Sequence, residues 1–183
     1  MRQRRRALSP QQQHRAAVGL KQQLMQAREF RRARRVALYL ANDGEINPMQ
    51  TIRSLWQRSI DVYLPVLHPV YPGHLVFIRF DRSSAMKPNK YGIAEPVYRH
   101  STRIPTRFLD VIAMPLVAFD ESGHRLGMGG GYYDRSLAFT RSTGKRPYLI
   151  GCAHECQHTA SLPTEAWDIP LNAIATDCRY QPI

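Results

Sequence analysis

Residues 109–135, LDVIAMPLVAFDESGHRLGMGGGYYDR, join an apolar run to a segment that is rich in glycine. The apolar run 110–119 predicts a buried strand, and residues 132–140 predict a helix. In open α/β sheets, ligands bind beyond the carboxyl ends of the strands. Glycine permits positive φ and a close backbone approach, and main-chain N–H groups at a helix start can receive phosphate oxygens. The stretch therefore predicts a strand, a ligand-holding glycine loop and a helix.

The glycine spacing matches neither common phosphate-binding fingerprint. Gly127, Gly129 and Gly131 are spaced G-x-G-x-G, so the dinucleotide pattern G-x-G-x-x-G is absent, and no Lys-Ser or Lys-Thr follows as in a Walker loop. On the glycines alone, a tight turn without a ligand fits equally well. Arg125 adds a cation at the loop entrance, and Asp134 adds a carboxylate that would repel phosphate unless a Mg²⁺ ion lay between them. Together these features favour a nucleotide-plus-metal site.

Outward from this stretch, helical and strand patterns alternate along the chain. The predicted helices cover residues 10–34, 47–59 and 132–140, and the predicted strands cover 35–41, 61–67, 75–80, 110–119, 148–153 and 173–176. Residues 81–110 show little periodicity and are predicted to be irregular. Nearly continuous apolar strands that alternate with helices are typical of helix layers around a parallel sheet. We expect one α/β domain over residues 1–183, a three-layer α/β/α arrangement around a largely parallel or mixed sheet.

The positive charge is concentrated at the N-terminus. The chain has 183 residues and a net charge of +12, and residues 1–35 hold 11 of its 26 Lys and Arg but only one of its 14 acids. This basic helical segment (1–34) either seeks an anion or is a solvated helix face. No segment is long and apolar enough to span a membrane. Three cysteines suit free thiols in a reducing cytoplasm.

Residues 125–135, RLGMGGGYYDR, resemble the signature of the 5-formyltetrahydrofolate cyclo-ligases, also called methenyltetrahydrofolate synthetases. That pattern is roughly R-L-G-x-G-x-G-Y-Y-D-R, and every fixed position is matched. LDVIAMPLVAFDESG, YGIAEP, YLANDGEI and LPTEAWDIPLNAIAT are similar to other segments of the family. Together these segments extend the resemblance over residues 36–176.

The resemblance implies an enzyme that converts 5-formyltetrahydrofolate and ATP to 5,10-methenyltetrahydrofolate, ADP and phosphate with Mg²⁺. Catalytic roles fall on Arg125 and Asp134, and Mg²⁺ would be held by Asp134 and Asp168. The ATP-binding residues carried over are Arg125, Leu126, Gly127, Met128, Gly129, Gly130, Gly131, Tyr132, Tyr133 and Asp168. The folate-binding residues are Leu40, Glu45, Met128, Gly129, Gly130, Gly131 and Tyr132. Of the two tyrosines, we expect one to pack the helix start and one to face ligand.

Plainer structural roles remain open for two of these residues. Asp168 could cap a turn before Pro170, and Glu45 could be a surface turn residue. The family also opens with Lys or Arg followed four positions later by Arg, upstream of a segment like RRALS. Arg2 and Arg6 have this spacing but not this position, so neither is assigned. Either the chain begins further upstream or the other arginines compensate.

Two rival functions belong to other classes. The Arg-rich N-terminus could bind nucleic acid, although no aromatic platform or known nucleic-acid motif accompanies it. Alternatively, the protein could bind ATP or folate without turnover. CAHEC (152–156) lacks an evident fourth metal ligand, so buried thiols are favoured over a metal site. For the cyclo-ligase, we expect a cytoplasmic monomer whose folate substrate can carry a polyglutamate tail.

Overall fold

The computed structural model describes residues 1–99, 102–142, 144 and 146–183. Its helices are α1 (Arg2–Arg6), α2 (Pro10–Gln26), α3 (Arg28–Arg32), α4 (Met49–Gln57) and α5 (Tyr132–Leu137), with 3₁₀ turns at Thr106–Phe108, Ala138–Arg141 and Glu155–Gln157. Its strands are β1 (Arg35–Ala37), β2 (Asp61–Leu67), β3 (Leu75–Arg79), β4 (Met86–Pro88), β5 (Ala94–Pro96), β6 (Arg103–Ile104), β7 (Val111–Pro115), β8 (Ala118–Phe119), β9 (Arg125–Leu126), β10 (Tyr148–Cys152), β11 (Ala173–Ala175) and β12 (Tyr180–Pro182).

Eight of the strands form one mixed sheet in the order β12-β11-β10-β7-β1-β2-β3-β6. The strands from β11 to β2 run parallel to their neighbours, whereas β12, β3 and β6 pair antiparallel at the two sides. The predicted α/β class with a largely parallel or mixed sheet is confirmed.

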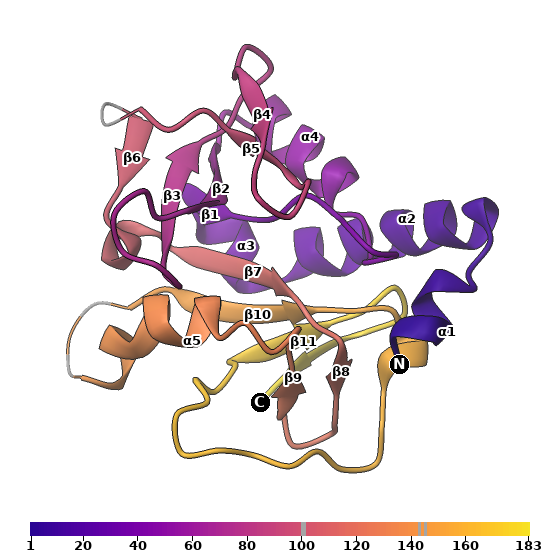
Figure 1. Ribbon diagram of the computed structural model, residues 1–183. Helices are drawn as coiled ribbons and strands as arrows, with labels where there is room; N and C mark the ends of the chain where they lie inside the picture. The colour runs from indigo at the N-terminus through magenta and orange to yellow at the C-terminus, as the bar shows by residue number, and fades with distance from the viewer. Residues whose placement is uncertain (100–101, 143, 145) are drawn as a thin grey trace.

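Helices cover both faces of this sheet. Figure 1 shows α2, α3 and α4 behind the sheet and α5 in front of it. One apolar cluster joins these helices to the sheet: it buries Leu20 and Leu24 of α2 and Phe30 of α3 against side chains of the central strands. Leu137 of α5 is buried in a second cluster on the opposite face. The three predicted layers thus have a large apolar cluster on each face of the sheet.

The helix that the sequence predicts over residues 10–34 is interrupted. It ends at Gln26, and Ala27 adopts an extended conformation with ψ 133° before α3 begins. Ala27 and Phe30 are both buried, so the break turns Phe30 into the core. Every helix of the described residues is too short or too polar to cross a bilayer.

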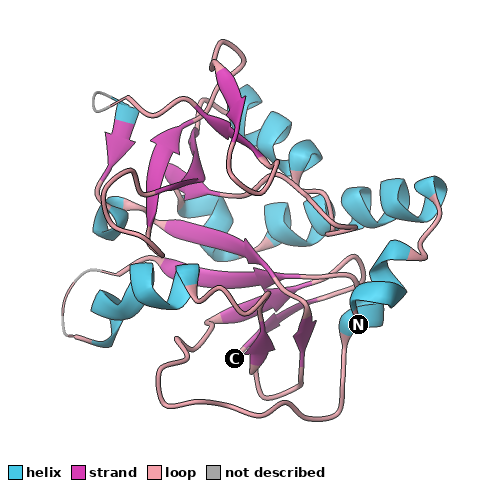
Figure 2. Cartoon of the chain, in the orientation of Figure 1, coloured by secondary structure: helices cyan, strands magenta, loops and turns pink. Residues whose placement is uncertain are grey.

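Residues 81–110 contain more structure than predicted. β4 and β5 form a separate two-stranded hairpin, and β6 pairs with β3 at the edge of the main sheet. The residues of β4 are all exposed, so no apolar alternation announces the strand in the sequence. By contrast, residues 159–172 run as a long connection without helix or strand, seen as the pink loop at the bottom of Figure 2.

Candidate active site

The predicted buried strand bends before it reaches the glycines. β7 ends at Pro115, and Ala118–Phe119 leave the sheet to pair with Arg125–Leu126 as the β8–β9 hairpin. The glycine loop, residues 127–131, follows this hairpin outside the main sheet and leads into the start of α5 (Figure 1). The order of strand, glycine loop and helix is as the sequence predicts. Because α5 has only six residues, we attribute little of the site's field to a helix dipole.

The glycine loop presents an open backbone face. Gly129 and Gly131 have φ values of +81° and +59°, in the left-handed region that favours glycine. A Cβ atom added at Gly127 or Gly129 would meet nothing within 4 Å. Residues 126–130 are all exposed, and the side chain of Met128 projects from the loop with 56% exposure. The loop can therefore receive a ligand directly on its main chain.

Arg125 and Asp134 are paired beneath this loop. Arg125 Nη2 donates to Asp134 Oδ1 at 2.5 Å, and the same guanidinium donates to the carbonyl of Ile169. The N–H of Ile169 returns to Asp134 Oδ1 at 3.3 Å. Burial lowers the pKa of Arg125, while the nearby carboxylates of Asp134 and Asp168 raise it. The two predicted catalytic residues are thus brought together, with Asp168 close by.

Both predicted metal ligands keep one carboxylate oxygen outside these hydrogen bonds. Among the described residues, Asp134 accepts only through Oδ1, and Asp168 accepts the N–H of Glu165 through Oδ2 at 2.9 Å. The latter bond is the turn cap that the sequence leaves open for Asp168. In the described part of the chain, no three His, Cys, Asp or Glu side chains gather as a complete metal cage. Mg²⁺ commonly binds one or two carboxylates together with phosphates and water, so these two residues fit that ion.

The acidic loop after β1, residues 42–45, lies near the glycine loop, since Arg5 Nη2 is 3.0 Å from Asp43 Oδ2 and 3.8 Å from Met128 Sδ. Asp43 and Gly44 have φ values of +53° and +73°, and Glu45 Oε2 accepts the N–H of Asn42 at 3.0 Å. Burial raises the pKa of Glu45, although the bond from Asn42 and the charge of Arg5 oppose that effect. A half-buried carboxylate in this position can accept hydrogen bonds from a polar heterocycle. Glu45 is therefore more than an exposed turn residue.

Tyr133 is packed against the core at the start of α5. Its ring packs on the apolar cluster that contains α5. Burial raises the pKa of its hydroxyl, and the charges of Glu45 and Arg125 act on it with opposite sign. Leu40 is half-buried and packs on the core next to the acidic loop.

Tyr132 lies at the surface instead. Its hydroxyl is 2.7 Å from that of Tyr91, in the tip of the β4–β5 hairpin, and the rings meet edge to face. Lys90 Nζ lies 5.1 Å from the centre of the Tyr91 ring. The two adjacent tyrosines therefore have different surroundings, Tyr133 packed on the core and Tyr132 in contact with the β4–β5 hairpin.

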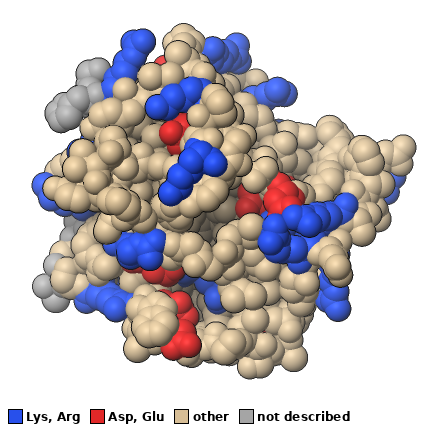
Figure 3. Space-filling model, viewed as in Figure 1, with Lys and Arg blue, Asp and Glu red and all other residues tan. Residues whose placement is uncertain are grey.

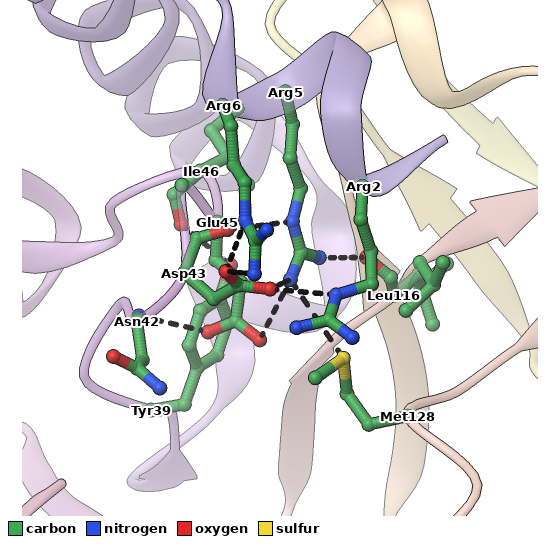
Figure 4. Close-up of polar contacts among 12 residues, drawn as sticks. Arg2, Arg5, Arg6, Tyr39, Asn42, Asp43, Glu45, Ile46, Leu116 and Met128 are labelled. Carbon is green, nitrogen blue, oxygen red and sulfur yellow. Dashed lines mark hydrogen bonds and ion pairs between the residues drawn. The ribbon is translucent and has the colours of Figure 1, made fainter. Parts of the chain in front are cut away.

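Three N-terminal arginines surround Asp43. Arg2 Nε and Arg5 Nη2 lie 2.9 and 3.0 Å from Asp43 Oδ2, and Arg6 pairs with Oδ1. Burial alone would raise the pKa of Asp43, but hydrogen bonds from these three arginines lower it to about 2. Figure 4 shows the guanidinium groups converging on this carboxylate, with Met128 of the glycine loop beside them. The sequence does not single out Asp43 or Arg5, because neither differs in type from its charged neighbours.

The molecular surface has a hollow beside α1. In Figure 3 this hollow is bordered by adjoining acidic and basic side chains where α1 lies in Figure 1. A cavity of about 610 Å³ lies on the other side of the acidic loop, between α2 and α4. Glu45 lines it, but no residue of the glycine loop does. The candidate site therefore lies on the exposed glycine loop, and the cavity is a separate feature that shares Glu45 with it.

The cysteines and histidine of residues 152–156 do not assemble into a site. Cys152 is buried in β10, His154 bonds to the carbonyl of Gly44 through Nε2, and Cys156 is exposed. The expected buried thiol is found at Cys152, but the expectation is wrong for Cys156, which is exposed in the 3₁₀ turn Glu155–Gln157 that follows the strand.

An open glycine loop, a paired arginine and carboxylate, and a nearby acidic loop on an α/β sheet are the parts of a small-molecule-binding site of the α/β class. The model of the 5-formyltetrahydrofolate cyclo-ligase family matches residues 1–177, so this chain belongs to that family. The resemblance seen in the glycine signature is confirmed.

Individual relatives agree with this assignment. The chain is 44% identical over 164 residues to the 5-formyltetrahydrofolate cyclo-ligase of Haemophilus influenzae. The matched region covers 90% of this chain and 87% of that protein. It is 43% identical over 179 residues to the Escherichia coli K12 protein of the same name, covering 98% and 97%. The solved structure of Aquifex aeolicus 5,10-methenyltetrahydrofolate synthetase matches with a TM-score of 0.82 at 29% identity, covering 99% of this chain and 88% of the other.

Proposed function

We propose that this protein converts 5-formyltetrahydrofolate and ATP to 5,10-methenyltetrahydrofolate, ADP and phosphate, with Mg²⁺. The observation that carries the proposal is the open main-chain face at Gly127 and Gly129, near the half-buried carboxylate of Glu45. Nearly full-length relatives named as cyclo-ligases support the same reaction. In this proposal, the glycine loop holds the nucleotide and the acidic loop holds the folate.

The chemistry needs positioning more than a protein nucleophile. A formyl oxygen is a poor leaving group, and transfer of the γ-phosphoryl group to it makes a good one. The N10 amine of the folate then attacks the formyl carbon and closes the ring; its N–H proton is lost to solvent, and the C–O bond breaks to release phosphate. Phosphoryl transfer depends mostly on alignment and on neutralised charge. Main-chain amides of residues 126–131 and the guanidinium of Arg125 are the groups available for this purpose.

Asp134 and Asp168 are the proposed Mg²⁺ ligands. Each keeps one carboxylate oxygen outside the hydrogen bonds described above, and both lie near Arg125. When bound, the ion would neutralise charge on the ATP phosphates. Arg125 meanwhile holds Asp134 in place through its 2.5 Å bond.

The folate end would be recognised by Glu45 and Leu40. The carboxylate of Glu45 can accept N–H groups of the pterin, and Leu40 offers an apolar wall. Residues Met128 to Tyr132 would border both substrates. We further propose a monomeric cytoplasmic enzyme that accepts polyglutamylated folate; the three free cysteines suit that compartment.

Asp134→Asn tests the metal and nucleotide assignment. Asparagine keeps an oxygen that can accept from Arg125 and Ile169 but loses the charge that Mg²⁺ requires. We expect ATP-dependent formation of methenyl-folate absorbance to fall about 100-fold or more, with an unchanged circular dichroism spectrum. Asp61→Asn is the control, because Asp61 pairs with Arg79 at 2.7 Å on β2 and β3. Wild-type turnover in Asp134→Asn would refute the assignment.

A further inference from the structure

Arg5 is the one arginine of α1 that the fold buries. Its side chain is 0% exposed, whereas Arg2, Arg4 and Arg6 are exposed. Burying a guanidinium costs free energy unless its N–H groups find acceptors. A buried arginine in a short, exposed helix therefore calls for a reason beyond packing.

The acceptors of Arg5 come from separate parts of the chain. Nε donates to the carbonyl of Asp43 at 2.9 Å, and Nη2 donates to the Asp43 carboxylate at 3.0 Å. Nη1 donates to the carbonyl of Leu116, just after β7, at 3.1 Å. Nη2 also lies 3.8 Å from Met128 Sδ in the glycine loop and 3.9 Å from Glu45 Oε1. One planar group thus touches the acidic loop, the end of a central strand and the glycine loop (Figure 4).

The acidic loop is held from its other side as well. The carbonyl of Gly44 is 3.3 Å from Gln13 Nε2 and 3.2 Å from His154 Nε2. A Cβ at Gly44 would come within 3.1 Å of the Arg5 carbonyl oxygen, so α1 and the loop are in close main-chain contact. The loop is therefore clamped between α1, α2 and the segment after β10, and Arg5 alone among these partners reaches the glycine loop.

We propose that Arg5 is a positioning residue that fixes Glu45 relative to Met128, so that the folate and nucleotide subsites form together. The inference rests on the proposed function, and Arg5 itself need not touch either substrate. The role requires a guanidinium, because its planar fork directs three N–H groups at once. A lysine ammonium is a compact charge and cannot reach Asp43, Leu116 and Met128 together.

The test compares three purified full-length variants with the wild type. Arg5→Met removes the fork, Arg5→Lys keeps the charge, and Arg4→Met is the matched control. Arg4 lies on the same helix, is exposed, and contacts only Met1 Sδ, at 3.8 Å, among the hydrogen-bonding groups described. Each variant is assayed for kcat and for KM of both substrates, and its folding is checked by thermal melting.

We expect Arg5→Met to raise KM for 5-formyltetrahydrofolate and for ATP by about tenfold or more each, because the loops lose their common tie. Arg5→Lys should lie between Arg5→Met and the wild type, and Arg4→Met should match the wild type. If Arg5→Met does not fold, Arg5→Lys carries the same expectation with a smaller change in KM.

A folded Arg5→Met or Arg5→Lys protein with wild-type KM for both substrates would overturn the inference, even if its melting temperature fell. That result would show a role in stability alone and would leave the proposed function standing. Absence of turnover in the wild type would instead overturn the proposed function, and the inference with it.

Discussion

Among single residues, we expect the ionised carboxylate of Glu45 to cost folding stability, and we propose that it binds the folate. Burial raises its pKa, so the folded protein favours the neutral carboxyl more than the unfolded chain does. Above the ordinary pKa of glutamate, about 4.3, the ionised carboxylate therefore costs folding free energy. That cost disappears as the pH falls and the carboxyl is protonated in both states.

Glu45→Gln should accordingly melt at a higher temperature than the wild type at pH 7, and the difference should vanish near pH 3. The amide can still accept the N–H of Asn42. Turnover should fall at the same time, with KM for the folate about tenfold higher, because the charged acceptor is lost. Glu121→Gln is the control, since hydrogen bonding to Arg179 lowers the pKa of Glu121 and reverses the sign. A lower melting temperature for Glu45→Gln at pH 7 would contradict the argument.

The glycine loop allows steric exclusion of ligand to be separated from backbone strain. Gly127→Val adds a side chain in open space without positive φ, so its melting temperature should stay at the wild-type value while ATP binding is lost. Gly129→Val should lose ATP binding and also about 1–2 kcal/mol of stability, because φ is +81°. Gly92→Val is the control for strain: at φ +74° in the β4–β5 turn it should lose stability and still bind ATP. Calorimetric ATP binding by Gly127→Val equal to the wild type would rule out the main-chain cradle.

Part of the candidate site could be predicted from the sequence. The glycines, Arg125, Asp134 and Glu45 could be selected from the sequence through their pattern and the family resemblance. Arg5 could not be, since a buried arginine within RQRRR has the same local pattern as an exposed one. Its burial depends on Asp43 and Leu116, which are 38 and 111 positions away in the sequence.

At the scale of elements, the central strands were predictable because their apolar runs are continuous. β2 spans the predicted range 61–67 in full. Pro65 suggests a strand end or an edge, yet β2 lies inside the sheet. Pairing of β2 with β1 stops at Tyr63, so beyond that residue β2 has β3 as its strand neighbour, which accommodates a proline without a donor. β12 was not predicted, because three half-buried or exposed residues gain strand structure only by pairing with β11.

A capping box at the start of α2 contributes to the stability of the N-terminal helices, and this contribution can be measured. Ser9 Oγ accepts the N–H of Gln12 at 3.3 Å, and Gln12 Oε1 accepts the N–H of Ser9 at 2.8 Å. Loss of this capping box in Ser9→Ala should cost about 1 kcal/mol, or about 2–4 °C in Tm for a chain of this size. Gln12→Glu retains the reciprocal bonds and should melt no lower than the wild type. An unchanged Tm in Ser9→Ala would show that tertiary contacts, not the cap, begin the helix.

At the scale of the whole molecule, the basic N-terminus is partly neutralised by the fold. The sequence gives residues 1–35 a strong positive charge, which kept nucleic-acid binding open as an alternative. In the structure, Arg2, Arg5 and Arg6 all engage Asp43. On the face shown in Figure 3, basic side chains are scattered with acidic ones between them, and they form no continuous stripe. Sequence charge alone could not reveal this pairing, because Asp43 lies in another segment.

We therefore expect weak binding to nucleic acid that depends steeply on salt. Non-specific electrostatic complexes have Kd values of about 10⁻⁴–10⁻⁶ M at physiological salt, and their affinity falls as counterions compete. Fluorescence anisotropy with a short duplex DNA and a single-stranded RNA, from about 50 to 200 mM salt, measures both quantities. Since the arginines around Asp43 are already paired, Asp43→Asn should free positive charge and strengthen this binding relative to the wild type. Submicromolar binding by the wild type at the higher salt, unaffected by Asp43→Asn, would favour a dedicated nucleic-acid surface instead.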